Sequence, residues 1–149
     1  MGSNSEILDS ATLVVENAFV KIFIIQAESI LILEWKFQIT LAERKSGFLQ
    51  ALEIIKAYEL RSWVVSNKNI YYVSPEEKSW IINEWLDLLN QSTLERSAIV
   101  CHENYDVLMS TWDLTSEVQQ QFQKKGIIQH RVFMNFPNAL NWLLSDMSN

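Results

Sequence analysis

The chain has 149 residues, about the length of one domain, and can bury a single sizeable core. Hydrophobic residues make up 48% and charged residues 20%, which excludes a disordered, collagen-like or coiled-coil protein. The net charge of -6 argues against a nucleic-acid partner, because phosphate binding depends on clustered Lys and Arg.

Residues 1–11 are polar and are expected to form a flexible N-terminus, followed by one domain over residues 12–149. Runs of β-branched and aromatic residues predict an antiparallel meander of three strands. These strands are expected over Thr12 to Glu16, Phe19 to Gln26 and Ile30 to Phe37. If the helices cover mainly one face of the sheet, an apolar patch is left for a homodimer contact. This patch would contain Val20, Ile22, Ile24, Ile30 and Ile32.

The period changes from two to helical between Thr40 and Glu59. The apolar stripe of this expected helix is formed by Leu41, Phe48, Leu52 and Ile55. The residues expected to face water are Glu43, Arg44, Lys45, Glu53 and Lys56. Gly47 lies inside the helix, where glycine costs about 1 kcal/mol relative to Ala, so it indicates close packing against the sheet.

A second helix is predicted from Ser74 to Leu89, between strands expected at Arg61 to Ser66 and Ser97 to His102. Ser74 is a good N-cap, Pro75 suits the first helical position, and Glu77 falls where its carboxylate can reach back to the Ser74 amide. Glu76 and Glu77 are therefore interpreted as a solvated helix start. A strand, a helix and a further strand form a right-handed parallel unit in nearly all known cases.

The C-terminal third predicts one or two helices between Asn104 and Lys125, with a possible break around residues 110–115 and a stop at Gly126. Gln129 to Asn135 alternates as a strand does, and Pro137 starts a last helix. The coarse order is βββαβαβαβα. The fold class predicted is α/β, with a mixed sheet of about six strands in which an antiparallel meander precedes βα crossover units.

Three segments resemble the SpoIIAA-like superfamily, the STAS and bacterial SEC14-like small domains. They are VSPEEKSWIINEW at Val73 to Trp85, RSAIVCHEN at Arg96 to Asn104 and RVFMNFPNALNWLL at Arg131 to Leu144. The resemblance implies a regulatory or binding module without catalytic residues. Sporulation-type members are switched by phosphorylation in an Asp-Ser-Ser-Gly-like loop, which this chain lacks.

Ligands of parallel α/β sheets bind beyond the carboxyl ends of the strands. That edge is expected to gather the polar residues that end the parallel strands and begin the following segments. Ser66, Asn67, Cys101, His102, Glu103 and Asn135 are the residues concerned. The candidate ligand-binding residues are Asn67, Ser74, His102, Glu103 and Asn135, and no catalytic or metal-binding residue is assigned.

Cys101 and His102 are adjacent in sequence, but neighbours in a strand point to opposite faces, so the imidazole cannot easily take the thiol proton. A buried, inert cysteine is therefore expected. His102, His130 and Glu103 would form a metal site only if two strand ends met, and no metal-binding spacing supports one. His130 is expected to fill an edge of the sheet.

With glycine only at positions 2, 47 and 126, the chain has no P-loop, dinucleotide-binding turn or G-x-S-x-G nucleophile elbow. The leading hypothesis is a non-catalytic regulatory or protein-binding domain without a cofactor. The alternatives are a carrier of a small apolar, lipid-like ligand, suggested by the many aromatic residues, and an enzyme that uses His102, Glu103 and Asn67.

Cys101 is the single cysteine, so no intramolecular disulfide can form and nothing demands an oxidising compartment. Glu6 and Asp9 stand where a signal peptide would carry Lys or Arg. No apolar stretch approaches the about 20 residues that span a bilayer. These features predict a cytoplasmic protein without integral membrane association.

Overall fold

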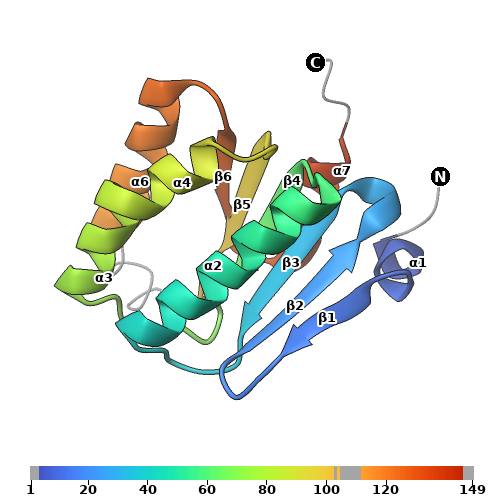
Figure 1. Cartoon of the computed structure of the whole chain (residues 1–149), viewed down its shortest axis with the longest axis horizontal. Helices are drawn as coiled ribbons and strands as arrows, with labels where there is room; N and C mark the ends of the chain where they lie inside the picture. The colour runs from blue at the N-terminus through green and yellow to red at the C-terminus, as the bar shows by residue number, and fades with distance from the viewer. Residues whose placement is uncertain (1–3, 103, 105–111, 146–149) are drawn as a thin grey trace.

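The computed structural model describes residues 4–102, 104 and 112–145 and shows an α/β fold around one six-stranded sheet (Figure 1). The strands are β1 (Thr12–Glu16), β2 (Val20–Ile25), β3 (Ile30–Trp35), β4 (Ser62–Ser66), β5 (Arg96–Val100) and β6 (Gln129–Phe133). The helices are α1 (Asn4–Asp9), α2 (Leu41–Tyr58), α3 (Pro75–Trp80), α4 (Leu86–Asn90), α6 (Trp112–Lys125) and α7 (Phe136–Leu144). A short 3₁₀ turn, η1 (Gln26–Glu28), joins β2 to β3, and a π turn, η2 (Ile81–Trp85), joins α3 to α4.

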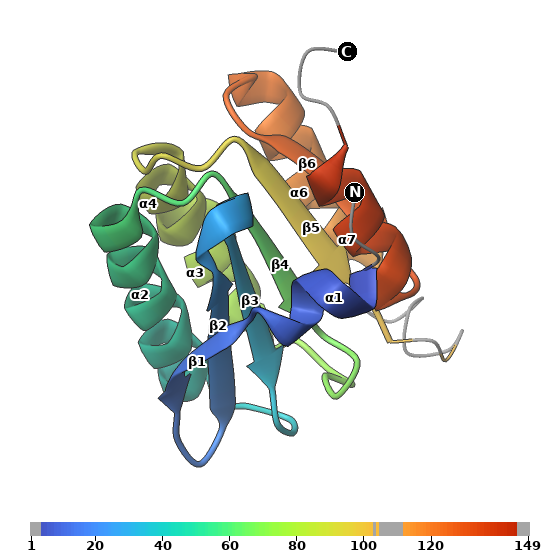
Figure 2. The same ribbon diagram turned by 90° about the vertical axis from the view of Figure 1, so that its right-hand side faces the viewer.

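The strands lie side by side in their sequence order, from β1 to β6. The first three strands pair antiparallel and β3 to β6 pair parallel, which confirms the predicted mixed sheet. Each parallel crossover therefore advances in the same direction, so right-handed connections place all the crossover helices on one face. Figure 2 shows α2, α3, α4 and α6 on that face and α1 and α7 on the other, which is here called the second face.

Both faces of the sheet carry an apolar cluster. On the helix-covered side, Leu31 and Leu33 join a large core, whereas Ile30 and Ile32 join the cluster of the second face. The prediction of an exposed apolar patch is therefore wrong. Its five residues are at most 4% exposed: Val20, Ile22, Ile24, Ile30 and Ile32. Val20, Ile22 and Ile24 join the core on the helix-covered face, whereas Ile30 and Ile32 join the cluster of the second face, which α7 covers.

Helix α7 seals the second face with Ala139, Leu140 and Leu143, all of which are buried. The sequence predicts no regular structure before Thr12, whereas Asn4–Asp9 forms the short helix α1. The physical reason is that Ile7 packs against the same second-face cluster.

The helical segment from Pro75 to Asn90 begins with the predicted capping box. The Ser74 hydroxyl accepts from the Glu77 amide and the Glu77 carboxylate accepts from the Ser74 amide, both at 3.1 Å. The π turn η2 follows, and the Leu86 amide donates to the Ile81 carbonyl. This wider turn brings two residues five apart onto one face, where Trp80 and Trp85 stack at 5.7 Å.

Arg44 and Glu77 are each 3% exposed, although both were expected to face solvent. Arg44 Nε lies 2.7 Å from Glu77 Oε2, and its guanidinium lies 5.7 Å from the Trp35 and Phe48 rings. Helical spacing alone placed Arg44 outside the apolar stripe, but α3 lies against that side of α2 and supplies the counter-charge. A buried charge is tolerated when it is paired in this way.

Gly47 confirms the predicted close approach between α2 and the sheet. A Cβ atom added there would lie 2.6 Å from two ring atoms of Trp35. Trp35, Trp63, Trp80 and Trp85 are all buried.

The C-terminal segments follow the predicted order. Helix α6 ends at Lys125. Gly126 follows it with φ +67°, the left-handed conformation that is typical of glycine after a helix. The break expected around residues 110–115 lies mostly outside the described residues. Within the described ranges, the helices are all too short or too polar to cross a membrane.

Candidate functional site

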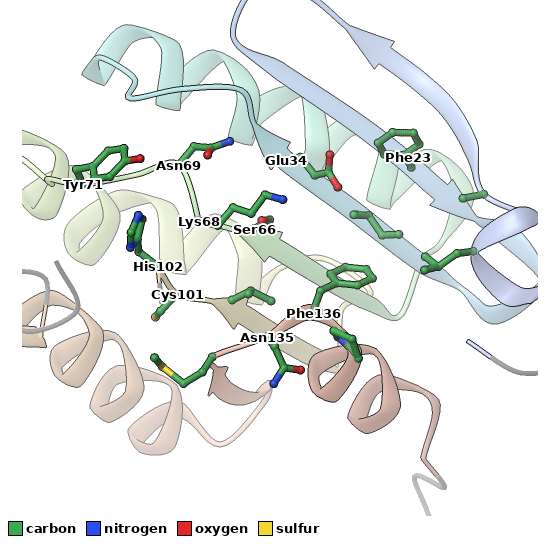
Figure 3. Close-up of a pocket in the computed structure, with 16 residues that line it drawn as sticks. Phe23, Glu34, Ser66, Lys68, Asn69, Tyr71, Cys101, His102, Asn135 and Phe136 are labelled. Atoms are coloured by element: carbon green, nitrogen blue, oxygen red, sulfur yellow. The ribbon is translucent and has the colours of Figure 1, made fainter. Parts of the chain in front are cut away.

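A hollow of about 770 Å³ opens on the second face at the carboxyl ends of β3, β4 and β5 (Figure 3). Its lining comes from both ends of the chain and from the middle strands. The apolar lining residues are Leu8, Ala11, Phe23, Ile32, Val100, Met134, Phe136 and Pro137. The others are Glu34, Ser66, Lys68, Asn69, Tyr71, Cys101, His102 and Asn135. This space is called the sheet-end hollow below.

The parallel register explains why these residues meet. Glu34, Ser66 and Val100 are Cα partners across β3, β4 and β5, so their side chains lie in one row on the second face. Two residues further along the chain, Lys68 and His102 return to the same face and also line the hollow. The strand order contains no reversal, so the hollow is not a crevice at a topological switch point.

Three polar side chains of the hollow have no bonding partner among the described residues. Ser66 as a whole is only 7% exposed, and its hydroxyl forms no hydrogen bond within the described part of the chain. Glu34, which is half-buried, and Lys68, which is exposed, likewise form no ion pair or hydrogen bond there. The Ser66 hydroxyl opens into the hollow, where it can bond a solvent or ligand atom.

His102 lies at one side of the hollow with its ring fixed by two contacts. Its Nδ1 accepts a hydrogen bond of 2.9 Å from the Asn104 amide, and its ring centroid lies 4.7 Å from that of Tyr71. Because Nδ1 is the acceptor, the neutral ring carries its proton on Nε2. His102 therefore offers an N–H donor to a bound molecule.

The segment beside the hollow is held by side-chain amides. Gln38 Oε1 accepts from the Tyr71 amide at 2.7 Å, and Gln38 Nε2 donates to the Tyr72 carbonyl at 2.7 Å. Asn69 Nδ2 donates to the Trp35 carbonyl at 3.1 Å. These bonds fix a loop that carries two exposed tyrosines, Tyr71 at 54% and Tyr72 at 58%.

Cys101 lines the hollow as a buried thiol, 6% exposed. Burial raises the pKa of Cys101 to about 11, so at neutral pH almost none of it is the nucleophilic thiolate. The expected burial of Cys101 is confirmed. Although Cys101 is adjacent to His102 in sequence, the imidazole Nδ1 is occupied by the Asn104 amide.

The sequence-derived candidates separate in space. His102 and Asn135 line the hollow, and the Asn135 side chain also caps α7 by accepting from the Asn138 amide at 2.9 Å. Asn67 lines a different cavity on the helix-covered face, and Ser74 is the N-cap of α3. Glu103 lies outside the described residues. The trio suggested for an enzyme is thus not assembled as expected, because Asn67 and His102 line separate cavities.

The second cavity holds about 80 Å³ between the sheet and helices α2, α4 and α6. His130 lies in its wall, with Nδ1 3.0 Å from the Ser97 hydroxyl and its ring stacked on Phe122. Trp63 Nε1 donates to the same hydroxyl at 2.7 Å. Burial lowers the pKa of His130 to about 4, so the imidazole is neutral at pH 7. His130 is a core residue, and His102 is in a separate cavity.

Sequence reasoning did not select Glu34, Lys68 or Phe23, although all three line the hollow. Glu34 alternates with Ile30 and Ile32 along β3, and a polar residue on that apolar face is the signal that could have identified it. Lys68 falls two residues after Ser66, so continuing the strand alternation by one step would have placed it on the same face.

Comparisons with protein-family models, curated proteins and solved structures find no match for this chain. The predicted kinship with the SpoIIAA-like superfamily therefore stays a prediction. The function must be inferred from the residues of the hollow themselves.

Proposed function

We propose that this chain is a non-catalytic binding module that holds a small molecule in the sheet-end hollow. The observation that carries the proposal is a hollow of about 770 Å³ with an apolar wall and a few polar groups that have no partner among the described residues. Small-molecule sites typically measure about 300–1,000 Å³ and combine apolar lining with a small number of placed polar groups.

The apolar wall favours a ligand with an apolar body. Ile32 and Val100, at 3% and 4% exposure, line the hollow from the sheet, and the rings of Phe23 and Phe136 line it as well (Figure 3). The Ser66 hydroxyl, which follows in the same row of the sheet, would bond a polar atom of the same ligand. This arrangement favours the carrier alternative, with a ligand that has a polar group as well as an apolar body.

The chemistry of the lining favours binding over catalysis. The Cys101 thiol is held protonated by burial, and the described neighbours of His102 supply an amide to Nδ1 rather than an orienting carboxylate. Catalytic histidines commonly need such an orienting group to act as a general base.

The test is native mass spectrometry of the freshly purified full chain, with an Ala11→Trp variant that fills the hollow. We expect a co-purifying small molecule with wild type, its loss with Ala11→Trp, and its retention with the control Ala57→Trp, which adds the same ring on the exposed side of α2. In a second arm, indole is titrated while the methyl resonance of Met134 is followed. No bound molecule together with no saturable shift would contradict the proposal.

A second candidate is the protein-binding regulatory domain that the sequence resemblance implies. The observation favouring it is the pair of exposed tyrosines Tyr71 and Tyr72, whose backbone is bonded by the Gln38 side chain and of which Tyr71 lines the hollow. A photo-crosslinking residue at position 72 should capture one defined protein in the native cell. The control is position 58, where Tyr58 is 45% exposed on α2. Equal capture at both positions would argue against this candidate.

A further inference from the structure

Resting on the proposed function, we infer that the ligand is a zwitterion of amino-acid type, with an ammonium and a carboxylate at one end and an aromatic body at the other. The inference starts from Glu34 and Lys68, which carry opposite charges and line one hollow. Figure 3 shows their side chains on the same side of the sheet, with Lys68 next to Ser66 and extending toward Glu34. They form no ion pair with each other or with any other described residue.

The placement of the charges follows from the sheet. Glu34 on β3 is the Cα partner of Ser66 on β4, and Lys68 follows Ser66 by two residues. A ligand head group beside Ser66 therefore meets the Glu34 carboxylate on the β3 side and the ammonium of Lys68, whose backbone follows the end of β4. Opposite charges so arranged match a head group that itself carries both signs.

Hydrogen-bond donors line the part of the hollow away from Phe23, where Lys68 and Ser66 lie together and His102 lies apart from them beside Tyr71 (Figure 3). The Ser66 hydroxyl has no partner among the described residues, and the neutral His102 ring carries an Nε2–H donor. A carboxylate beside Ser66 can accept from its hydroxyl and from the Lys68 ammonium. The ammonium is then left to Glu34, which can only accept.

The apolar wall adjoins the charged row on the side of Phe23, Ile32 and Phe136. Rings bound between aromatic side chains gain from stacking as well as from burial. A ligand with a single carboxylate would place its charge in the same hollow as the unpaired Glu34, and a simple amine would leave Ser66 and Lys68 without a partner. The zwitterion satisfies both sets of groups.

Three probes with one aromatic body test the inference: tryptophan with both charges, tryptamine without the carboxylate, and indole-3-propionate without the amine. Indole itself is the uncharged reference. At pH 7, with the Met134 methyl resonance as the readout, tryptophan should bind at least about tenfold more tightly than either singly charged analogue. The Ala11→Trp variant should abolish binding of all four probes.

Charge-removing variants assign each contact. In Glu34→Gln, tryptophan and indole-3-propionate should bind with affinities within about twofold of each other, because the ammonium has lost its partner. In Lys68→Met, the affinities for tryptophan and tryptamine should likewise approach each other, because the carboxylate has lost the Lys68 ammonium. Glu53→Gln and Lys124→Met, exposed residues on α2 and α6, are the matched controls and should retain the full preference.

The outcomes separate this inference from the proposed function. If indole and a singly charged analogue bind the hollow as tightly as tryptophan, the zwitterion is overturned while small-ligand binding stands. If none of the four probes shifts the Met134 resonance and no molecule co-purifies, both are overturned. Tryptophan binding that survives Ala11→Trp places the site elsewhere and also overturns the inference.

Discussion

Arg44 Nε on α2 and Glu77 Oε2 on α3 lie 2.7 Å apart, with both side chains at most 4% exposed. The same carboxylate uses its other oxygen to accept from the Ser74 amide at 3.1 Å. One residue thus closes the capping box of α3 and neutralises a cation buried beside α2. Glu77 therefore links α3 to α2, a role that a position in the first turn of a helix does not by itself indicate.

Replacing Glu77 by Gln should lower the free energy of unfolding by about 3 kcal/mol or more, because Arg44 is left as an unpaired buried cation. The amide can still accept from Ser74, so the cap is retained. Ser74→Ala, which removes the cap, should cost only about 1 kcal/mol. Urea unfolding followed by tryptophan fluorescence measures both changes.

The matched control for that comparison is the double variant Arg44→Met, Glu77→Gln. Removing both charges should recover most of the loss, since an apolar side chain of similar length then packs near Trp35 and Phe48. A Glu77→Gln variant no less stable than Ser74→Ala would show that the ion pair contributes nothing.

Gly47→Ala should destabilise the protein by about 1–3 kcal/mol, although alanine is the better helix former. The added Cβ would meet the Trp35 ring at 2.6 Å, and this ring is itself 1% exposed with no free space to move into. Thermal unfolding by circular dichroism is the measurement. In a Trp35→Leu background the same substitution should cost less, and an equal cost in both backgrounds would exclude the ring as the cause.

His130 should make stability fall as pH decreases from about 6.5 towards about 4. Burial lowers the pKa of the folded imidazole to about 4, so over this range the unfolded chain binds more protons and unfolding is favoured. The contribution of His130 to the free energy of unfolding is fully present above pH 6.5 and amounts to at most about 3 kcal/mol.

The measurement for His130 is the free energy of unfolding in urea at several pH values, for wild type and for His130→Asn. Carboxylates also titrate in this range, so the difference between the two pH profiles isolates the imidazole. Parallel profiles between pH 4 and 6.5 would show that the folded imidazole is not shifted.

Cys101 should react with iodoacetamide at pH 8 roughly 100-fold more slowly in the folded protein than in urea, because burial raises its pKa to about 11 and leaves little thiolate. Intact-mass spectrometry over time gives both rates from the single cysteine. Similar rates in the two conditions would show that the thiol is accessible and ionised. A ligand in the sheet-end hollow should slow the folded rate further, since Cys101 lines that space.

The sequence alone determined the order of the elements from β1 onward, the class of sheet and the helix starts at Thr40 and Ser74. These follow from local interactions: capping boxes span three residues, and strand alternation is visible within each strand. The Leu31/Leu33 and Ile30/Ile32 faces of β3 were predictable for the same reason.

Only the tertiary structure decided which charges are buried and which polar residues meet. Arg44 is buried because α3 packs beside α2, and Glu34 joins Ser66 because β3 and β4 pair in a particular register. Likewise, the second face is closed over Ile30 by α7, yet left hollow at the strand ends near Lys68. Contacts between residues far apart in sequence depend on how whole elements dock, and no local pattern encodes that.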